Sequence, residues 1–310
     1  MNKKNTAMDK KTVVLESYPD FLQGRIEKRE RERNRHMPNY VNGNISQLVI
    51  DDLKLWRVGV LKVSFKGGDP SLHKKLAEAA KIWSQYGNIE FDFGHDPKTQ
   101  TYRSWTPTDT SHIRVGFDQE GYWSLVGTDS SDPEIVGPGE ITLNLAGFDE
   151  RLPVNWKTVV LHEFGHALGF HHEHQSPDLE CDFDWPKVYD YLAGPPNYWP
   201  KWKVDHNLRQ LNRGNLTYSA HDKNSIMHYS FPAWMFITGE KSPCHTPENL
   251  ELSAEDKNMM AEAYPMEPER IQLLDAYRMG NLESLAQNRS LTKSLRQQHR
   301  NHLEYYMGCQ

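Results

Sequence analysis

Residues 162–172 read His-Glu-Phe-Gly-His-Ala-Leu-Gly-Phe-His-His, and no other stretch constrains the chain as strongly. They match the pattern H-E-x-x-H-x-x-G-x-x-H at every specified position. Histidines four residues apart lie on one face of a helix, so His162 and His166 can bind the same metal ion. Glu163 is rotated from His162 by about 100° around the helix, which places its carboxylate beside the ion. The pattern therefore predicts a zinc-dependent hydrolase that cuts peptide bonds.

The flanking sequence predicts a helix around these residues. Pro153 suits a first helical turn, Asn155 is a candidate cap, and Val160 and Phe164 recur at helical spacing. Gly169 is expected to end the helix, because glycine adopts the left-handed conformation without a steric penalty. The chain then turns, and a third histidine can return to the metal.

That third histidine has three candidates after the turn, namely His171, His172 and His174. The pattern selects His172, and we expect the other two to lie around the ligand set or at the surface; the alternative is that one or both donate to a nearby carboxylate. Three neutral histidines leave a tetrahedral zinc ion one open position for water, which is typical of a catalytic site. Zinc lowers the pKa of bound water from about 15.7 to about 7. Glu163 is then the expected general base, and later the general acid toward the leaving amine.

Further along the chain lies a second motif, Ser-Ile-Met-His-Tyr at residues 225–229. Together with residues 162–173, it resembles the astacin family of metzincin zinc endopeptidases. The resemblance implies a tight methionine turn, with Met227 as an apolar floor beneath the metal. It also implies that Tyr229 is a fifth, displaceable metal ligand that stabilises the tetrahedral intermediate, since a phenol hydroxyl can donate a hydrogen bond to developing negative charge. The resemblance thus implies one catalytic zinc ion, the metal ligands His162, His166, His172 and Tyr229, and the catalytic residues Glu163 and Tyr229.

The resemblance covers roughly residues 56–265 and implies an α+β fold, a metzincin-type zincin domain of two lobes. The upper lobe, about residues 53–175, would carry a mixed twisted sheet and helices above the cleft. The lower lobe, about residues 176–265, would be irregular and end in a helix that Ser253 caps. The residue pattern itself predicts a helix capped by Asp69 and short strands near residues 58–65, 89–93, 113–117, 122–126 and 141–145. Residues 121–127 resemble the family's edge strand, which pairs with an extended peptide substrate.

The chain also departs from the family pattern. Asn88 and Tyr122 stand at two places where the family typically has disulfide cysteines. The chain has three cysteines, an odd number without framework spacing, so we expect no disulfide framework. Glu173 matches a family glutamate that pairs with the new N-terminus after activation cleavage, although no propeptide is recognisable.

Composition restricts the class of protein further. The chain has 310 residues, is 37% hydrophobic and contains nine tryptophans, which supports a sizeable core. The formal net charge of −6 argues against nucleic acid as a general partner. There is no apolar run of the roughly 18 residues that a membrane span requires, and residues 1–25 lack the apolar region of a signal peptide. We therefore expect a protein or peptide substrate, no membrane span, and a location in the cytoplasm or export without a signal peptide.

Two segments lie outside the resemblance. Residues 1–52 form a charged extension, where we expect a solvated helix with pairs such as Glu27 with Arg31. The alternative is a functional segment, either a basic docking tag or a latency segment. Residues 266–310 form a helical tail, whose two helices we expect to be separated by a break at Gly280-Asn281. The tail either packs against the catalytic domain or binds a partner or inhibits the enzyme.

Two other functions remain compatible with the metal pattern. The first keeps the fold and the zinc but binds peptides without turnover, which an intact Glu163 argues against. The second is a zinc hydrolase of the peptide cross-links in cell walls, because the metal ligands alone do not distinguish between these substrates.

Overall fold

The computed structural model describes residues 17–36, 50–51, 53–57, 59–195, 197–211, 216–217 and 221–308. At its centre is a five-stranded sheet with the strand order β3-β2-β4-β6-β5. The strands are β2 (Gly59–Lys66), β3 (Ile89–Asp92), β4 (Ile113–Gly116), β5 (Tyr122–Ser124) and β6 (Leu143–Leu145). The first four in the order are parallel, whereas β5 pairs antiparallel with β6 at one edge. The mixed sheet that the sequence predicts is confirmed, although Val58, its expected first residue, lies outside the described residues.

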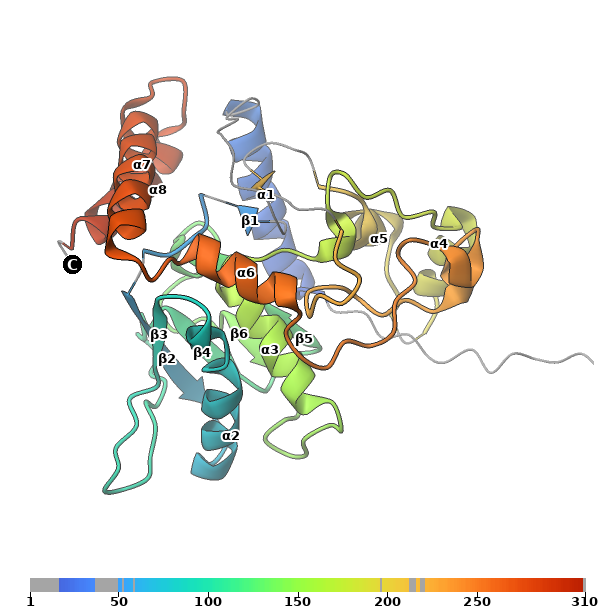
Figure 1. Cartoon of the computed structure of the whole chain (residues 1–310), viewed down its shortest axis with the longest axis horizontal. Helices are drawn as coiled ribbons and strands as arrows, with labels where there is room; N and C mark the ends of the chain where they lie inside the picture. Colours follow the sequence, from blue (N-terminus) through green and yellow to red (C-terminus); the bar gives the residue numbers. More distant parts are fainter. Residues whose placement is uncertain are drawn as a thin grey trace, which may run out of the picture.

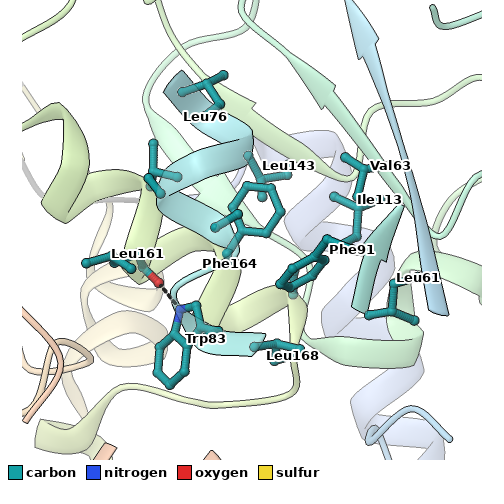
Figure 2. Close-up of a cluster of buried hydrophobic side chains, with 14 of the residues drawn as sticks. Leu61, Val63, Leu76, Trp83, Phe91, Ile113, Leu143, Leu161, Phe164 and Leu168 are labelled. Carbon is teal, nitrogen blue, oxygen red and sulfur yellow. Dashed lines mark hydrogen bonds between the residues drawn. The ribbon is translucent and has the colours of Figure 1, made fainter. Parts of the chain in front are cut away.

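Helices α2 (Pro70–Ala80) and α3 (Trp156–Ala167) lie together on one face of this sheet (Figure 1). As predicted, Asp69 caps α2, and its carboxylate accepts a hydrogen bond from the backbone N–H of Leu72 at 2.8 Å. Apolar side chains from both helices and from the sheet form one buried cluster. Within it, the indole N–H of Trp83 donates to the carbonyl of Leu161 on α3 at 2.9 Å (Figure 2). This contact holds the helix that carries the histidine motif against the core.

The lower lobe contains more regular structure than the sequence predicts. Its helices are α4 (Trp185–Ala193), α5 (Lys201–Leu208) and α6 (Ala254–Ala263). The prediction of an irregular segment before residue 250 missed α4 and α5. The closing helix α6 is present, and its predicted cap Ser253 forms a reciprocal capping box with Asp256.

The lower lobe also corrects the prediction about cysteines. Cys181 and Cys244 are joined by a disulfide, with their Cα atoms 5.5 Å apart and a sequence separation of 63. Spacing along the chain failed here because the two cysteines approach each other only after the lobe has folded. The third cysteine, Cys309, lies outside the described residues.

The N-terminal helix α1 (Asp20–His36) is present as expected, and Arg31 pairs with Glu27 at 3.3 Å. The expectation that the helix is solvated was wrong for one of its faces. Leu22 and Ile26 are buried there, and so are Arg29 and Arg33. The cause is a matching set of apolar and acidic side chains on the catalytic domain, which the local sequence does not reveal.

The tail forms two helices that lie side by side, α7 (Pro268–Gln287) and α8 (Lys293–Tyr306) (Figure 1). The predicted break at Gly280-Asn281 was wrong, because α7 continues through both residues. A glycine inside a helix costs about 1 kcal/mol relative to alanine, and burial of Leu282 and Leu285 just beyond it offsets this cost. The division of the chain at residues 52 and 265 stays a prediction.

Short elements complete the described part of the chain: the antiparallel pair β1 (Ile50–Asp51) and β7 (Leu216–Thr217), and the 3-10 turns η1 (Trp83–Gln85), η2 (Gly127–Ser131), η3 (Glu173–Gln175), η4 (Ala233–Met235) and η5 (Gly239–Lys241). Among the helices described, none combines the length and the apolar character that crossing a membrane would require.

Candidate metal centre

Three imidazoles converge on one point. His162 and His166 extend from successive turns of α3, and His172 follows the turn at Gly169, whose φ of +105 ends the helix as predicted. The Nε2 atom of His166 lies 3.1 Å from the Nε2 atoms of both His162 and His172. Zinc–nitrogen bonds of about 2.0–2.1 Å at tetrahedral angles separate ligand atoms by about 3.3 Å. The three nitrogens therefore fit a zinc ion with little adjustment, and these residues form a group that could hold a metal.

The opposite nitrogens of the two helical histidines are held by backbone carbonyls. The Nδ1 atom of His162 lies 2.7 Å from the carbonyl oxygen of Ile226, and that of His166 lies 2.6 Å from the carbonyl oxygen of Phe170. A carbonyl only accepts, so each Nδ1 carries the proton and donates it. Each Nε2 then keeps its lone pair for a metal, which is the tautomer that zinc binding needs.

His172 is oriented by a side chain that the sequence did not point to. Its Nδ1 atom lies 3.1 Å from Oε1 of Gln175, and the amide nitrogen of Gln175 donates to the carbonyls of His206 and Arg209. These two backbone bonds fix which end of the amide faces the histidine. Gln175 was missed because no local motif distinguishes it from any other glutamine after a histidine.

The two alternative histidines lie outside the cluster. His174 is buried, and its Nε2 atom bonds with the backbone carbonyl of Asn207 at 3.0 Å. His171 is half-buried, and burial lowers the pKa of its ring to about 3, with the positive charge of Lys54 adding to the effect. The structure thus brings His172, which the pattern selects, to the other two candidate ligands.

Glu163 and Tyr229 border the histidine cluster. The side chain of Glu163 is fully buried on α3 beside His162. The ring of Tyr229 lies against that of His172, with 4.1 Å between the centroids, and is stacked with that of His162 at 5.7 Å. The structure therefore brings both residues that the sequence nominates for catalysis next to the candidate ligands.

The Ser-Ile-Met-His-Tyr segment forms a tight turn that a distant carboxylate holds. Asp256 of α6 accepts hydrogen bonds from the hydroxyl of Ser225 at 2.7 Å and from the backbone N–H of Ile226 at 2.8 Å. Ile226 in turn supplies the carbonyl that orients His162. In the sequence, Asp256 is recognisable only as part of the capping box with Ser253, so its second role was missed.

Glu173, which follows the last candidate ligand, is also buried. One of its oxygens accepts the backbone N–H of Asp222 at 2.9 Å, and burial raises the pKa of its carboxyl to about 8. Glu173 therefore contacts Asp222, in the segment just before the methionine turn.

Two imidazoles on one helix, a third that returns after a glycine, a helical glutamate and a methionine turn define a zinc peptidase of the metzincin type. The family model for Astacin, a peptidase family, matches residues 49–247, and the chain belongs to this family. The resemblance stated from the two motifs is confirmed.

Known proteins agree with this assignment. Zinc metalloproteinase nas-2 of Caenorhabditis elegans is 29% identical over 134 residues, which cover 42% of this chain and 40% of that protein. Zinc metalloproteinase nas-27 of the same organism is 28% identical over 178 residues, or 57% of this chain and 34% of that protein. The match thus spans less than half the length of either relative. The solved structure of myroilysin is 36% identical with a TM-score of 0.60 and covers 71% of this chain and 99% of that chain. The α+β fold is therefore confirmed.

Proposed function

We propose that the chain is a zinc-dependent endopeptidase that hydrolyses peptide bonds of protein or peptide substrates. The observation that carries the proposal is the convergence of three Nε2 atoms beside the buried carboxylate of Glu163. A module that only binds peptides has no need of a base at that position. The ligands we assign to zinc are His162, His166 and His172, with Tyr229 as a displaceable fifth.

When bound, zinc makes water acidic enough to ionise near neutral pH and polarises the peptide carbonyl. Glu163 acts as the general base that takes a proton from the attacking water. After the tetrahedral stage, Glu163 returns this proton to the leaving amine, so that the amine departs neutral. Full burial of the side chain keeps bulk water from competing for the proton.

We assign to Tyr229 the stabilisation of negative charge on the substrate. Its ring packs against His172 and His162, so its position is set by the same residues that would hold the metal. A phenol hydroxyl donates a hydrogen bond to the oxyanion that forms from the peptide carbonyl. Removing one such donor typically reduces kcat by about 100- to 1000-fold.

The substrate would lie extended along β5, the edge strand of the sheet. The strand is antiparallel to β6 and contacts α3, the helix that carries Glu163. An extended peptide adds to such an edge through backbone hydrogen bonds, and side-chain pockets then supply specificity. This mode suits an endopeptidase, because the backbone is common to all protein substrates.

The test is hydrolysis of a generic unfolded protein by the zinc-loaded chain, by the chelated chain, and by the chelated chain after zinc is returned. We expect activity, loss of activity and recovery. Peptidoglycan fragments are assayed in parallel to test the cell-wall alternative. That alternative predicts that the fragments are cleaved and that the unfolded protein stays intact. Stoichiometric zinc and peptide binding without any cleavage would replace the proposal with a binding function.

A further inference from the structure

The outer edge of β5 is engaged by the chain's own N-terminal segment. The N–H of Leu125 donates to the carbonyl of Thr142, which lies next to β6. In an antiparallel pair, every second residue bonds with the neighbouring strand and the residues between them face outward. The carbonyl of Ser124 therefore points away from β6, toward the open edge of the sheet. The hydroxyl of Tyr18 donates to the carbonyl of Ser124 at 2.8 Å. The Tyr18 ring also meets that of Trp123 edge-on, with 5.9 Å between the centroids. A tyrosine therefore holds a backbone acceptor that an added strand would use.

Tyr18 is also tied to the lower lobe and lies near the candidate site. Lys203 on α5 donates to the carbonyl of Tyr18 at 3.3 Å and pairs with Asp20 at 2.9 Å. Burial raises the pKa of the Tyr18 hydroxyl; Lys54 opposes this shift, and the nearby charge of Glu163 adds to it. The segment thus links the edge of the sheet to α5.

Helix α1, which follows this segment, is part of the hydrophobic core. Leu22 and Ile26 belong to a buried cluster whose other members come from the catalytic domain: Trp123, Leu125, Ile135, Val136 and Ile141. Removing α1 would expose this cluster, including two residues on and next to β5. Large exposed apolar surfaces are unfavourable in water, so α1 is needed for the catalytic domain to keep this form.

Buried ion pairs attach α1 just as firmly. Arg29 pairs with Asp132 at 2.8 Å, and Arg33 pairs with Asp129 at 2.9 Å. Lys54 pairs with Asp129 as well, at 2.9 Å. Without α1, Asp132 would be a buried charge that had lost its arginines, and breaking a buried pair from one side is strongly destabilising.

The tail contacts α1 as well, partly through the same arginine. Arg29 donates to the hydroxyl of Ser294 at 3.1 Å and to the side-chain oxygen of Gln298 at 3.0 Å, both on α8. Thr292, which caps α8, bonds with the carboxylate of Glu32. The N-terminal helix therefore contacts both the catalytic domain and the tail.

We propose that residues 17–36 stay on the active enzyme as a fixed wall of the substrate site, and that Tyr18 is a specificity-determining residue within it. This inference rests on the proposed function. By holding the Ser124 carbonyl, Tyr18 removes one backbone hydrogen bond from a peptide paired with β5, and its ring restricts the side chain that fits there. The role of the tail is to keep this wall in place.

The test compares Tyr18→Phe, which loses only the hydroxyl, with Tyr18→Ala, which also loses the ring. Tyr306→Phe is the matched control, because the hydroxyl of Tyr306 donates to the carbonyl of Trp56 at 3.2 Å, away from β5. Each substitution is made in two backgrounds. In the parent, kcat/KM is measured on a position-scanning peptide library. In the Glu163→Gln variant, the Kd of fluorescent peptides is measured. We expect Tyr18→Phe to bind peptides about 2- to 10-fold more tightly, the range of one net hydrogen bond. Tyr18→Ala should also broaden the residue preference at one substrate position.

Three outcomes would count against the inference in distinguishable ways. Both Tyr18 variants matching Tyr306→Phe in Kd and in residue preference would overturn it while leaving the endopeptidase intact. Intact mass measurements showing that the active form lacks residues 17–36 would do the same. Absence of cleavage and of peptide binding in every variant would instead remove the proposed function, and the inference with it.

Discussion

Gly165 on α3 faces the sulfur of Met227 so closely that a Cβ atom at this glycine would overlap it. The glycine between the first two histidines therefore lets the methionine turn pack directly beneath the helix. We predict that Gly165→Ala lowers the free energy of unfolding by about 1–3 kcal/mol, the usual cost of overpacking a core. It should also weaken zinc binding, because Ile226 next to Met227 orients His162.

Urea unfolding and competition with a zinc chelator measure these two effects. Gly280→Ala is the matched control, since this glycine is also helical but a Cβ there meets nothing within 4 Å. The control should gain up to about 1 kcal/mol from the better helix propensity of alanine. Equal effects of the two substitutions would show that Gly165 has no special relationship with Met227.

Gln175 is predicted to tune the metal site through His172. Gln175→Leu removes the acceptor of the His172 Nδ1 proton, and such outer partners typically change metal affinity by about 10- to 100-fold. Gln210→Leu is the control, because Gln210 also donates to backbone carbonyls of this region but contacts no candidate ligand. Zinc affinity of the folded variants, measured by competition, should fall for Gln175→Leu alone. Equal affinities would contradict the orienting role of Gln175.

The disulfide between Cys181 and Cys244 is predicted to stabilise the lower lobe. With a sequence separation of 63 between the cysteines, the chain-entropy model gives about 4 kcal/mol of stabilisation. The double variant Cys181→Ser, Cys244→Ser should therefore unfold at a lower denaturant concentration than the oxidised parent. Reducing agent should shift the parent toward the variant and leave the variant unchanged. A parent that is insensitive to reductant would indicate that the bond does not form.

Burial of His299 on α8 predicts a loss of stability in acid. Burial lowers the pKa of His299 from 6.5 to about 3, and Arg33, His302 and Arg29 add to this shift. The folded chain therefore takes up this proton less readily than the unfolded chain, so the contribution is complete above pH 6.5 and is lost as pH falls toward about 3. Between about pH 7.5 and about pH 5, we expect this histidine to account for about 2 kcal/mol.

Urea unfolding of His299→Gln across this pH range checks the prediction. The control is His95→Gln, because His95 is exposed. The first variant should show a shallower dependence of stability on pH than the parent. The second should follow the parent, because this residue is exposed at the surface. An unchanged slope for His299→Gln would exclude burial of this histidine as the cause.

Much of the candidate site could be predicted because its residues are neighbours in sequence. His162, His166 and His172 are positioned by one helix and one turn, so their spacing alone indicates that they meet. Gln175 and Asp256 could not be found in the same way. Gln175 bonds with backbone carbonyls at the end of α5, and Asp256 of α6 bonds with the methionine turn. Side-chain hydrogen bonds between segments far apart in the chain leave no periodic trace in a sequence. The catalytic roles of Glu163 and Tyr229 stay predictions.

The fold followed the same division between local and distant contacts. The strands and the Asp69 cap were predictable, since alternation and capping are local signals. Helices α4 and α5 were missed, although Asp184 caps α4 by accepting the N–H of Lys187, because their apolar residues serve a lobe that has its own separate core. The solvated helix predicted for α1 was wrong on one face, since only tertiary structure reveals the acidic partners of Arg29 and Arg33.

The central claim is that Glu163 carries out proton transfer at a zinc site formed by three histidines. The most direct measurement is hydrolysis of an unfolded protein by the parent and by Glu163→Gln at equal zinc content, with the exposed Glu150 changed to glutamine as a control. We predict that Glu163→Gln retains one zinc per chain and binds peptide but cleaves at least about 100-fold more slowly, the usual contribution of a general base. Glu150→Gln should match the parent. Cleavage by zinc-loaded Glu163→Gln at the rate of the parent would contradict this claim.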